Sequence, residues 1–127
     1  PMRTHDVEDL INKRASSTDL IVANVGDNAI DVVNLLKKHN ISQVPVFSDK
    51  ELVGILDETD LILPLAMGKL KPNEPIIHLI KGNVLWVDLE DTLEELSLHM
   101  QQGYIALVKD RKGKPHIVTK IDLLDFI

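Results

Sequence analysis

The sequence contains an internal repeat, and this feature constrains the fold more than any other. Segment 54–62 (GILDETDLI) returns 62 positions later as segment 116–124 (HIVTKIDLL). In both segments an apolar, strand-like run leads directly into a helical pattern. That pattern begins at a capping residue, Asp57 or Thr119, and has an aspartate three residues later. We therefore expect a chain built from two copies of one supersecondary unit.

The same succession of patterns precedes both segments. The first copy (19–68) has an apolar strand, a helix capped by Asn28 and a hairpin; the second (83–127) has a strand, a helix capped by Asp91 and a hairpin. The expected strands are 20–22, 44–47, 52–56, 85–87, 105–108 and 115–118. Gly68 should end the helix opened by Asp57.

Two connecting stretches complete the chain. Residues 69–82 form a proline-containing linker with a short helix at 76–80. Another short helix is expected at 7–14, followed by a polar linker at 15–19.

Each copy by itself is too small to bury a sufficient core. The sequence therefore predicts one α/β (α+β) module over residues 1–127, in which two strand–helix–hairpin–helix repeats are related by a pseudo-twofold axis. A cleft is expected between the copies, and concave seams of this kind are where small ligands usually bind.

Composition excludes several classes of function. The net charge of −6 argues against a nucleic-acid surface, which needs a basic face. The absence of cysteine indicates a reducing, cytoplasmic location, and the sequence shows neither a membrane span nor a signal peptide. Because the chain begins with Pro1 and ends inside an apolar pattern, we expect a fragment of a longer protein.

The side chains offer no catalytic or metal-binding arrangement. The five histidines lack the spacing of a ligand set, so no metal site is expected. The acidic cluster Glu90, Asp91, Glu94 and Glu95 is interpreted as the solvated first turn of a helix. No pairing of a nucleophile with a base is evident, and this chain is not expected to be an enzyme.

The tandem copies, each closing on an apolar strand and a Thr-x-x-Asp type of turn, resemble a pair of CBS domains, the Bateman module, over about residues 19–126. Segments 66–72, 91–93, 105–108 and 118–126 are together similar to the C-terminal regulatory region of cystathionine β-synthases. The resemblance implies a regulatory module, without a cofactor of its own, that senses S-adenosylmethionine or another adenosyl compound. It would control a pyridoxal-phosphate enzyme of cysteine biosynthesis that joins serine and homocysteine, and would self-associate as a homodimer.

The resemblance also implies a set of ligand-binding residues. Asp122 would hold the ribose hydroxyls, and Thr119 would support the sugar or the turn, with Val118 and Ile121 beside them. The adenine and amino-acid ends would be lined by Ile41, Ser42, Gln43 and Val44. From local sequence alone, Thr119 and Asp122 form a capping box worth about 1 kcal/mol, and the two roles are compatible.

The two copies are expected to differ as sites. In the first copy Asp57, Glu58 and Asp60 would repel a phosphate, so Asp60 and Asp57 mark a weaker site. The net negative charge favours a ligand without phosphates, although Lys120 could serve one.

Two departures from the family pattern keep alternatives open. His116 stands where the family usually has glycine and is interpreted as a partly exposed residue at a hairpin end. Ser42 stands where the S-adenosylmethionine-binding version can carry an aspartate. The alternatives are a dimerisation module with degenerate ligand sites, or an AMP- or ATP-sensing CBS pair of another enzyme or transporter.

Overall fold

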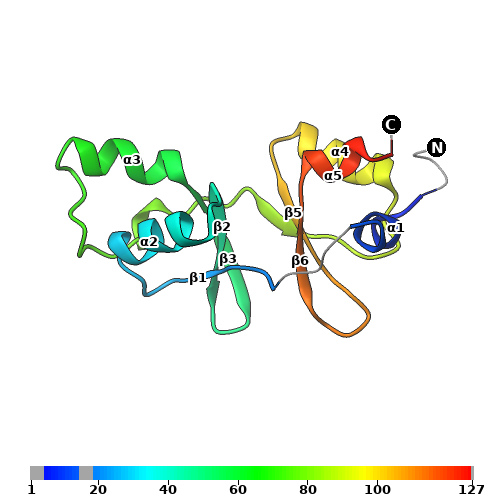
Figure 1. Cartoon of the computed structure of the whole chain (residues 1–127), viewed down its shortest axis with the longest axis horizontal. Coiled ribbons are helices and arrows are strands. Elements are labelled where there is room, and N and C mark those ends of the chain that lie inside the picture. The colour runs from blue at the N-terminus through cyan, green and yellow to red at the C-terminus, as the bar shows by residue number, and fades with distance from the viewer. Residues whose placement is uncertain (1–4, 15–18, 127) are drawn as a thin grey trace. The chain divides into compact units, whose positions relative to one another are not determined.

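The computed structural model describes residues 5–14 and 19–126, which form two compact units. Unit 1 combines the chain up to Leu20 with the chain from Asn83 onward, and unit 2 is Ile21–Gly82. Each unit holds a three-stranded sheet with its helices on one side (Figure 1). Within the described ranges, no helix has the length and apolar character needed to span a membrane.

In unit 2 the strand order is β1-β2-β3, with β1 parallel to β2 and β2 antiparallel to β3. The strands are β1 (Ala23–Asn24), β2 (Gln43–Ser48) and β3 (Glu51–Asp57). Helix α2 (Ala29–His39) connects β1 to β2, and α3 (Glu58–Ala66) follows β3 without a loop because Asp57 caps it directly. Gly68 follows the C-cap of α3 with a φ of +70°, which confirms its predicted role.

Unit 1 repeats this arrangement with strand order β4-β5-β6 and the same parallel and antiparallel pairings. Its elements are β4 (Val84–Trp86), α4 (Leu93–Gln101), β5 (Ile105–Lys109), β6 (Pro115–Val118) and α5 (Lys120–Leu124). The predicted mixed α/β class with two equivalent strand–helix–hairpin–helix copies is confirmed.

Both hydrophobic cores are completed by residues from outside the repeated unit. In unit 1, helix α1 (Val7–Asn12) inserts Val7 and Leu10, both almost fully buried, among residues of α4, β5 and β6. In unit 2, Leu70 and Ile76, which both precede the 3-10 helix η2 (Ile77–Leu79), join the residues of α2, β2 and β3. The segment before the first copy thus packs with the second copy, and the segment before the second copy packs with the first.

Two local expectations were wrong by one or a few residues. The first paired strand is Ala23–Asn24 and not 20–22, because the fully buried Ala23 is the residue placed opposite Val46 in the core, whereas Val22 is 36% exposed. Helix α4 is capped by Thr92, whose hydroxyl accepts the Glu95 N–H at 3.0 Å. The Asp91 carboxylate instead accepts the Asp88 N–H at 3.0 Å within the preceding loop. Most of the expected linker 15–19 lies outside the described residues.

Gly54 allows the chain after η2 to approach strand β3 closely. The Ile55 N–H donates to the Lys81 carbonyl at 2.8 Å, and the Lys81 N–H donates to the Ile55 carbonyl at 2.9 Å. A Cβ atom on Gly54 would lie 2.4 Å from both the Lys81 carbonyl oxygen and the Ile80 Cγ2. The two main chains can pair in this way only because residue 54 has no side chain.

We predict that Gly54→Ala lowers the free energy of unfolding by about 1–3 kcal/mol, because the added methyl group must push the Ile80–Lys81 segment away from β3. Gly82→Ala is the matched control, since a Cβ there meets no atom within 4 Å. Urea denaturation followed by circular dichroism measures both. Equal stability of the two variants would contradict the packing argument.

Candidate functional site

Asp122 and Thr119 lie where strand β6 becomes helix α5 in unit 1. Thr119 is the N-cap of α5, and its N–H donates to Asp122 Oδ2 at 2.9 Å; the side chain of Thr119 in turn accepts the N–H of Asp122. The Thr119 hydroxyl also lies 3.3 Å from Asp122 Oδ2. The capping box predicted from local sequence is therefore confirmed, and the Asp122 side chain keeps 19% of its surface exposed.

Arg14, which is not among the predicted ligand residues, holds the same carboxylate. Its Nη2 lies 2.7 Å from Asp122 Oδ2 and also donates to the carbonyl of Ile117, the β6 residue that precedes Val118. Its neighbour Lys13 donates from Nζ to the Asp125 carbonyl at 2.6 Å. The end of α1 is thus attached to α5 through two adjacent cations.

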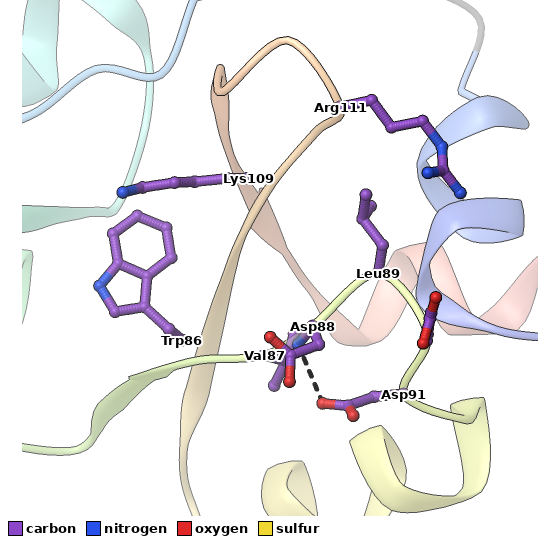
Figure 2. Close-up of a pocket in the computed structure, with 8 residues that line it drawn as sticks. Trp86, Val87, Asp88, Leu89, Asp91, Lys109 and Arg111 are labelled. Atoms are coloured by element: carbon purple, nitrogen blue, oxygen red, sulfur yellow. Dashed lines mark hydrogen bonds between the residues drawn. The ribbon is translucent and has the colours of Figure 1, made fainter.

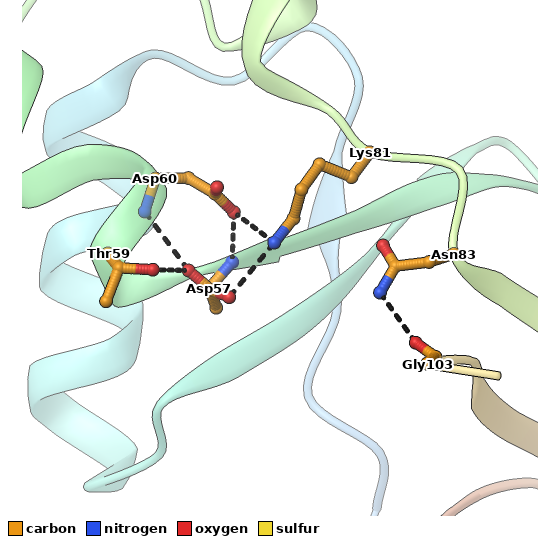
Figure 3. Close-up of polar contacts among 6 residues, drawn as sticks. All are labelled: Asp57, Thr59, Asp60, Lys81, Asn83 and Gly103. Atoms are coloured by element: carbon orange, nitrogen blue, oxygen red, sulfur yellow. Dashed lines mark hydrogen bonds and ion pairs between the residues drawn. The ribbon is translucent and has the colours of Figure 1, made fainter. Parts of the chain in front are cut away.

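The equivalent turn in unit 2 also carries a cation (Figure 3). Asp57 Oδ1 accepts the Asp60 N–H at 3.1 Å and the Thr59 hydroxyl at 2.5 Å, and Asp60 Oδ2 accepts the Asp57 N–H at 2.9 Å. Lys81 Nζ lies 3.0 Å from Asp57 Oδ2 and 3.2 Å from Asp60 Oδ2. One ammonium group therefore bridges two of the three carboxylates that were expected to repel a phosphate.

This cluster shifts the proton affinities of its members. Partial burial raises the pKa of the Asp57 carboxyl, but the hydrogen bonds from Thr59 and Lys81 together outweigh it and lower that pKa to about 2. The hydrogen bond to Asp57, supported by Asp60, raises the pKa of the Lys81 ammonium against the opposing effect of burial. Asp57 and Lys81 are therefore both charged at neutral pH.

The remaining predicted ligand residues lie in different surroundings. Ile41 to Val44 belong to unit 2 and adjoin its own capped turn, since the Ser42 carbonyl accepts the Glu58 N–H at 2.8 Å and Gln43 pairs with Asp57 across the hairpin. Ser42 is exposed, whereas Val44 is fully buried. In unit 1, Val118 is buried and Ile121 is 74% exposed. Their roles toward a ligand stay predictions.

Ile41 also borders an apolar groove between helices α2 and α3. The groove has a volume of about 390 Å³, with Lys37, Asn40 and Glu58 among its polar lining residues. Its apolar lining comprises Val33, Leu36, Ile41, Leu61, Ile62 and Leu65. This lining suits an apolar partner better than a sugar or a phosphate.

A larger pocket, about 690 Å³, lies in unit 1 beside the loop from β4 to α4 (Figure 2). Residues 86–91 line it together with Lys109 and Arg111. Arg111 is engaged by Glu8 through two contacts, of 2.6 and 2.7 Å, and its hydrogen bond lowers the pKa of Glu8. Lys109 Nζ lies 5.1 Å from the centre of the Trp86 ring. Its two cations thus already have partners within unit 1, and none of the predicted ligand residues lines it.

His116 supports the second hairpin. Its Nε2 lies 2.9 Å from Asp110 Oδ2, and only 10% of its side chain is exposed. The other oxygen of Asp110 accepts the N–H groups of Lys112 and Lys114, each at 2.9 Å. The hydrogen bond with His116 lowers the pKa of Asp110. A structural position at the hairpin end, as interpreted from sequence, accounts for this residue.

The sequence holds only a weak pattern near the two cations, and it is not sufficient to identify them. The apolar pair Leu10-Ile11 is followed by Lys13-Arg14, and the pair Leu79-Ile80 is followed by Lys81. Arg14 and Lys81 are 67 positions apart, however, so the offset of 62 that aligns the hairpins does not align them.

We predict that Lys81→Met destabilises unit 2 at neutral pH but has little effect near pH 2. The lowered pKa of Asp57 means that this carboxylate stabilises the fold above about pH 4 and that the contribution is lost as the pH falls toward 2. Because the pair is partly exposed, the loss should not exceed about 1 kcal/mol.

Urea unfolding at neutral pH, pH 4 and pH 2 measures this difference, and Lys71→Met provides an exposed lysine control from the segment that precedes η2. A destabilisation that does not change with pH would contradict the assignment of the ion pair.

The sequence and the fold were compared with those of known proteins. The CBS-domain family model matches residues 7–66, and no curated protein sequence matches the chain. Among solved structures, a CBS-domain containing protein from Agrobacterium tumefaciens has a TM-score of 0.75 at 20% identity, covering 95% of this chain and 97% of that one. A hemolysin-like protein containing a CBS domain from Oenococcus oeni has a TM-score of 0.75 at 17% identity, covering 98% and 90%.

The CBS domain of a membrane protein from Sphaerobacter thermophilus has a TM-score of 0.72 at 20% identity, with 99% of this chain and 90% of that one covered. At these identities the structural likeness shows the fold alone. Residues 7–66 thus match a CBS domain, and the chain as a whole has the fold of CBS-domain proteins.

Proposed function

We propose that the chain is a regulatory CBS pair that binds an adenosyl compound through Asp122. S-adenosylmethionine is the first candidate, and AMP and adenosine are the others. The observation that carries the proposal is the state of the Asp122 carboxylate: all its hydrogen bonds within the described residues reach Oδ2. A carboxylate has about four acceptor positions, so Oδ1 retains the capacity to accept a ribose hydroxyl.

The first copy is proposed as the weaker site. Both oxygens of Asp57 and one oxygen of Asp60 already accept hydrogen bonds from Thr59, Lys81 and the main chain. Asp60 resembles Asp122 in that its contacts within the described residues reach Oδ2, so the weaker assignment rests on charge: one Lys81 ammonium only partly offsets the three carboxylates Asp57, Glu58 and Asp60.

We propose that this module belongs to a cystathionine β-synthase with a separate pyridoxal-phosphate domain. The support is the similarity of segments 66–72 and 118–126 to that enzyme's regulatory region. Regulation requires only that the ligand prefer one of two arrangements, and a coupling of about 1–3 kcal/mol is the usual scale. A rate of serine and homocysteine condensation that responds to S-adenosylmethionine in the full-length protein would support this assignment, and inactivity would exclude it.

We predict that Asp122→Asn weakens binding of the adenosyl ligand at least about tenfold, because a neutral amide replaces a charge-assisted acceptor. The amide oxygen can still accept the Thr119 N–H, so the cap is largely preserved. Isothermal titration calorimetry with S-adenosylmethionine, adenosine, AMP and ATP measures the effect. Asp125→Asn, at the exposed end of the same helix, is the control. If none of the four compounds binds the wild-type protein, the sensing function is wrong.

A specific observation also favours self-association. Helix α3 exposes Ile62 and Leu63 by 59% and 62%, and its C-cap residue Met67 is 56% exposed. Ile62 also lines the apolar groove beside α2. Such a surface is typical of a protein–protein interface, and twofold dimers are the commonest assembly. We therefore propose a homodimer that buries this surface, whether or not the ligand sites are active.

We predict that Ile62→Glu shifts a wild-type dimer to the monomer without unfolding it, because the side chain is already largely exposed. Val53→Glu, at a 43% exposed position on β3, is the control and should leave the dimer intact. Sedimentation velocity distinguishes the two states. A wild-type protein that is monomeric at high concentration would exclude the dimer.

A further inference from the structure

In both units a cationic side chain pairs with the capping-box aspartate, but the main chain that carries the cation is positioned differently. In unit 2 the main chain of Lys81 pairs with Ile55, which Gly54 permits, and the Lys81 side chain then reaches Asp57 and Asp60 (Figure 3). In unit 1 residue 116 is histidine, and its Cβ is incompatible with an equally close approach of the main chain. There the longer Arg14 side chain makes both contacts, to the Ile117 carbonyl and to Asp122.

Both units thus make the same two contacts. One is with the strand residue, Ile55 or Ile117, and the other is with the capping-box aspartate, Asp60 or Asp122. They are made by unrelated sequence positions and by different chemical groups. Lys81 and Arg14 reach equivalent aspartates although the main chain approaches the strand differently in the two units. We attribute this shared contact to its effect on the aspartate and not to local packing.

We propose that Arg14 is an internal competitor for Asp122, so that a ligand hydroxyl must displace it to engage both carboxylate oxygens. This inference rests on the proposed adenosyl-binding function. Oδ2 accepts the Thr119 N–H, the Thr119 hydroxyl at 3.3 Å and the Arg14 guanidinium. A vicinal diol that donates one hydrogen bond to each oxygen must therefore displace a donor from Oδ2, and Arg14 is the donor that does not belong to the cap.

Displacement of Arg14 would loosen a defined part of the chain. The start of α1 is fixed independently, because Val7 and Leu10 lie in the core and Glu8 is held by Arg111. The end of α1 depends on the contacts of Lys13 and Arg14 with residues of β6 and α5. Ligand binding therefore frees the last turn of α1, which leads into the first copy, and leaves its first turn in place.

The test compares Arg14→Met with Lys13→Met, the neighbouring cation, which contacts the Asp125 carbonyl and not Asp122. Adenosine is the probe because it carries the diol without a charge. In calorimetry Arg14→Met should bind adenosine about three to ten times more tightly than the wild type, as expected for removal of a partly exposed ion pair, and Lys13→Met should not. Binding to Arg14→Met that is equal or weaker would overturn the competition.

Hydrogen exchange provides a second readout that a merely structural ion pair would not give. Adenosine should accelerate amide exchange in residues 11–14 of the wild type and leave it unchanged in Arg14→Met, whereas residues 7–10 should not respond. Slower exchange at residues 11–14 on binding would overturn the proposal while leaving the adenosyl-binding function intact. If adenosine binds neither the wild type nor Arg14→Met, both the competition and the adenosine-binding function fail.

Discussion

Each unit depends on apolar residues that lie outside the repeated sequence. A core built only from one strand, one hairpin and two short helices is small, and domains of that size are marginal in water. Val7 and Leu10 complete the core of unit 1, and Leu70 and Ile76 complete that of unit 2. Helix α1 and the residues from Leu70 to Ile76 are therefore structural parts of the two units.

This packing also determines where the cations lie. Once α1 is fixed in the core of unit 1 by Val7 and Leu10, its last residues are placed beside the start of α5, and Arg14 reaches Asp122. Once Ile76 is fixed in unit 2, the chain after η2 runs along β3, and Lys81 reaches Asp57 and Asp60. The electrostatics of both capped turns thus follow from the way in which the cores are completed.

The repeat, the hairpins and the capped turns could be predicted because they depend on local patterns. The alternation of apolar residues, the Asp57 and Thr119 caps and Gly68 each act within a few residues of chain. Arg14 and Lys81 could not be predicted, because their contacts join residues 108 and 24 positions apart and their side chains look like ordinary surface charges. The choice of Thr92 over Asp91 as a cap was missed because two adjacent residues could serve, and the loop uses Asp91 elsewhere.

The ion pairs of Arg14 and Lys81 change the expected effect of the negative net charge on phosphate-bearing ligands. A net charge of −6 suggests that phosphates are disfavoured throughout, but screening at physiological ionic strength limits such effects to about 8 Å. At the shortest range Asp122 pairs with Arg14, whereas Asp57 and Asp60 share the single ammonium of Lys81, and Glu58 lies between them in the sequence. The predicted repulsion of phosphates therefore applies to the first copy. If the second copy binds an adenosyl ligand as proposed, selection there would depend on the contacts that the ligand makes and not on the charge of the whole chain.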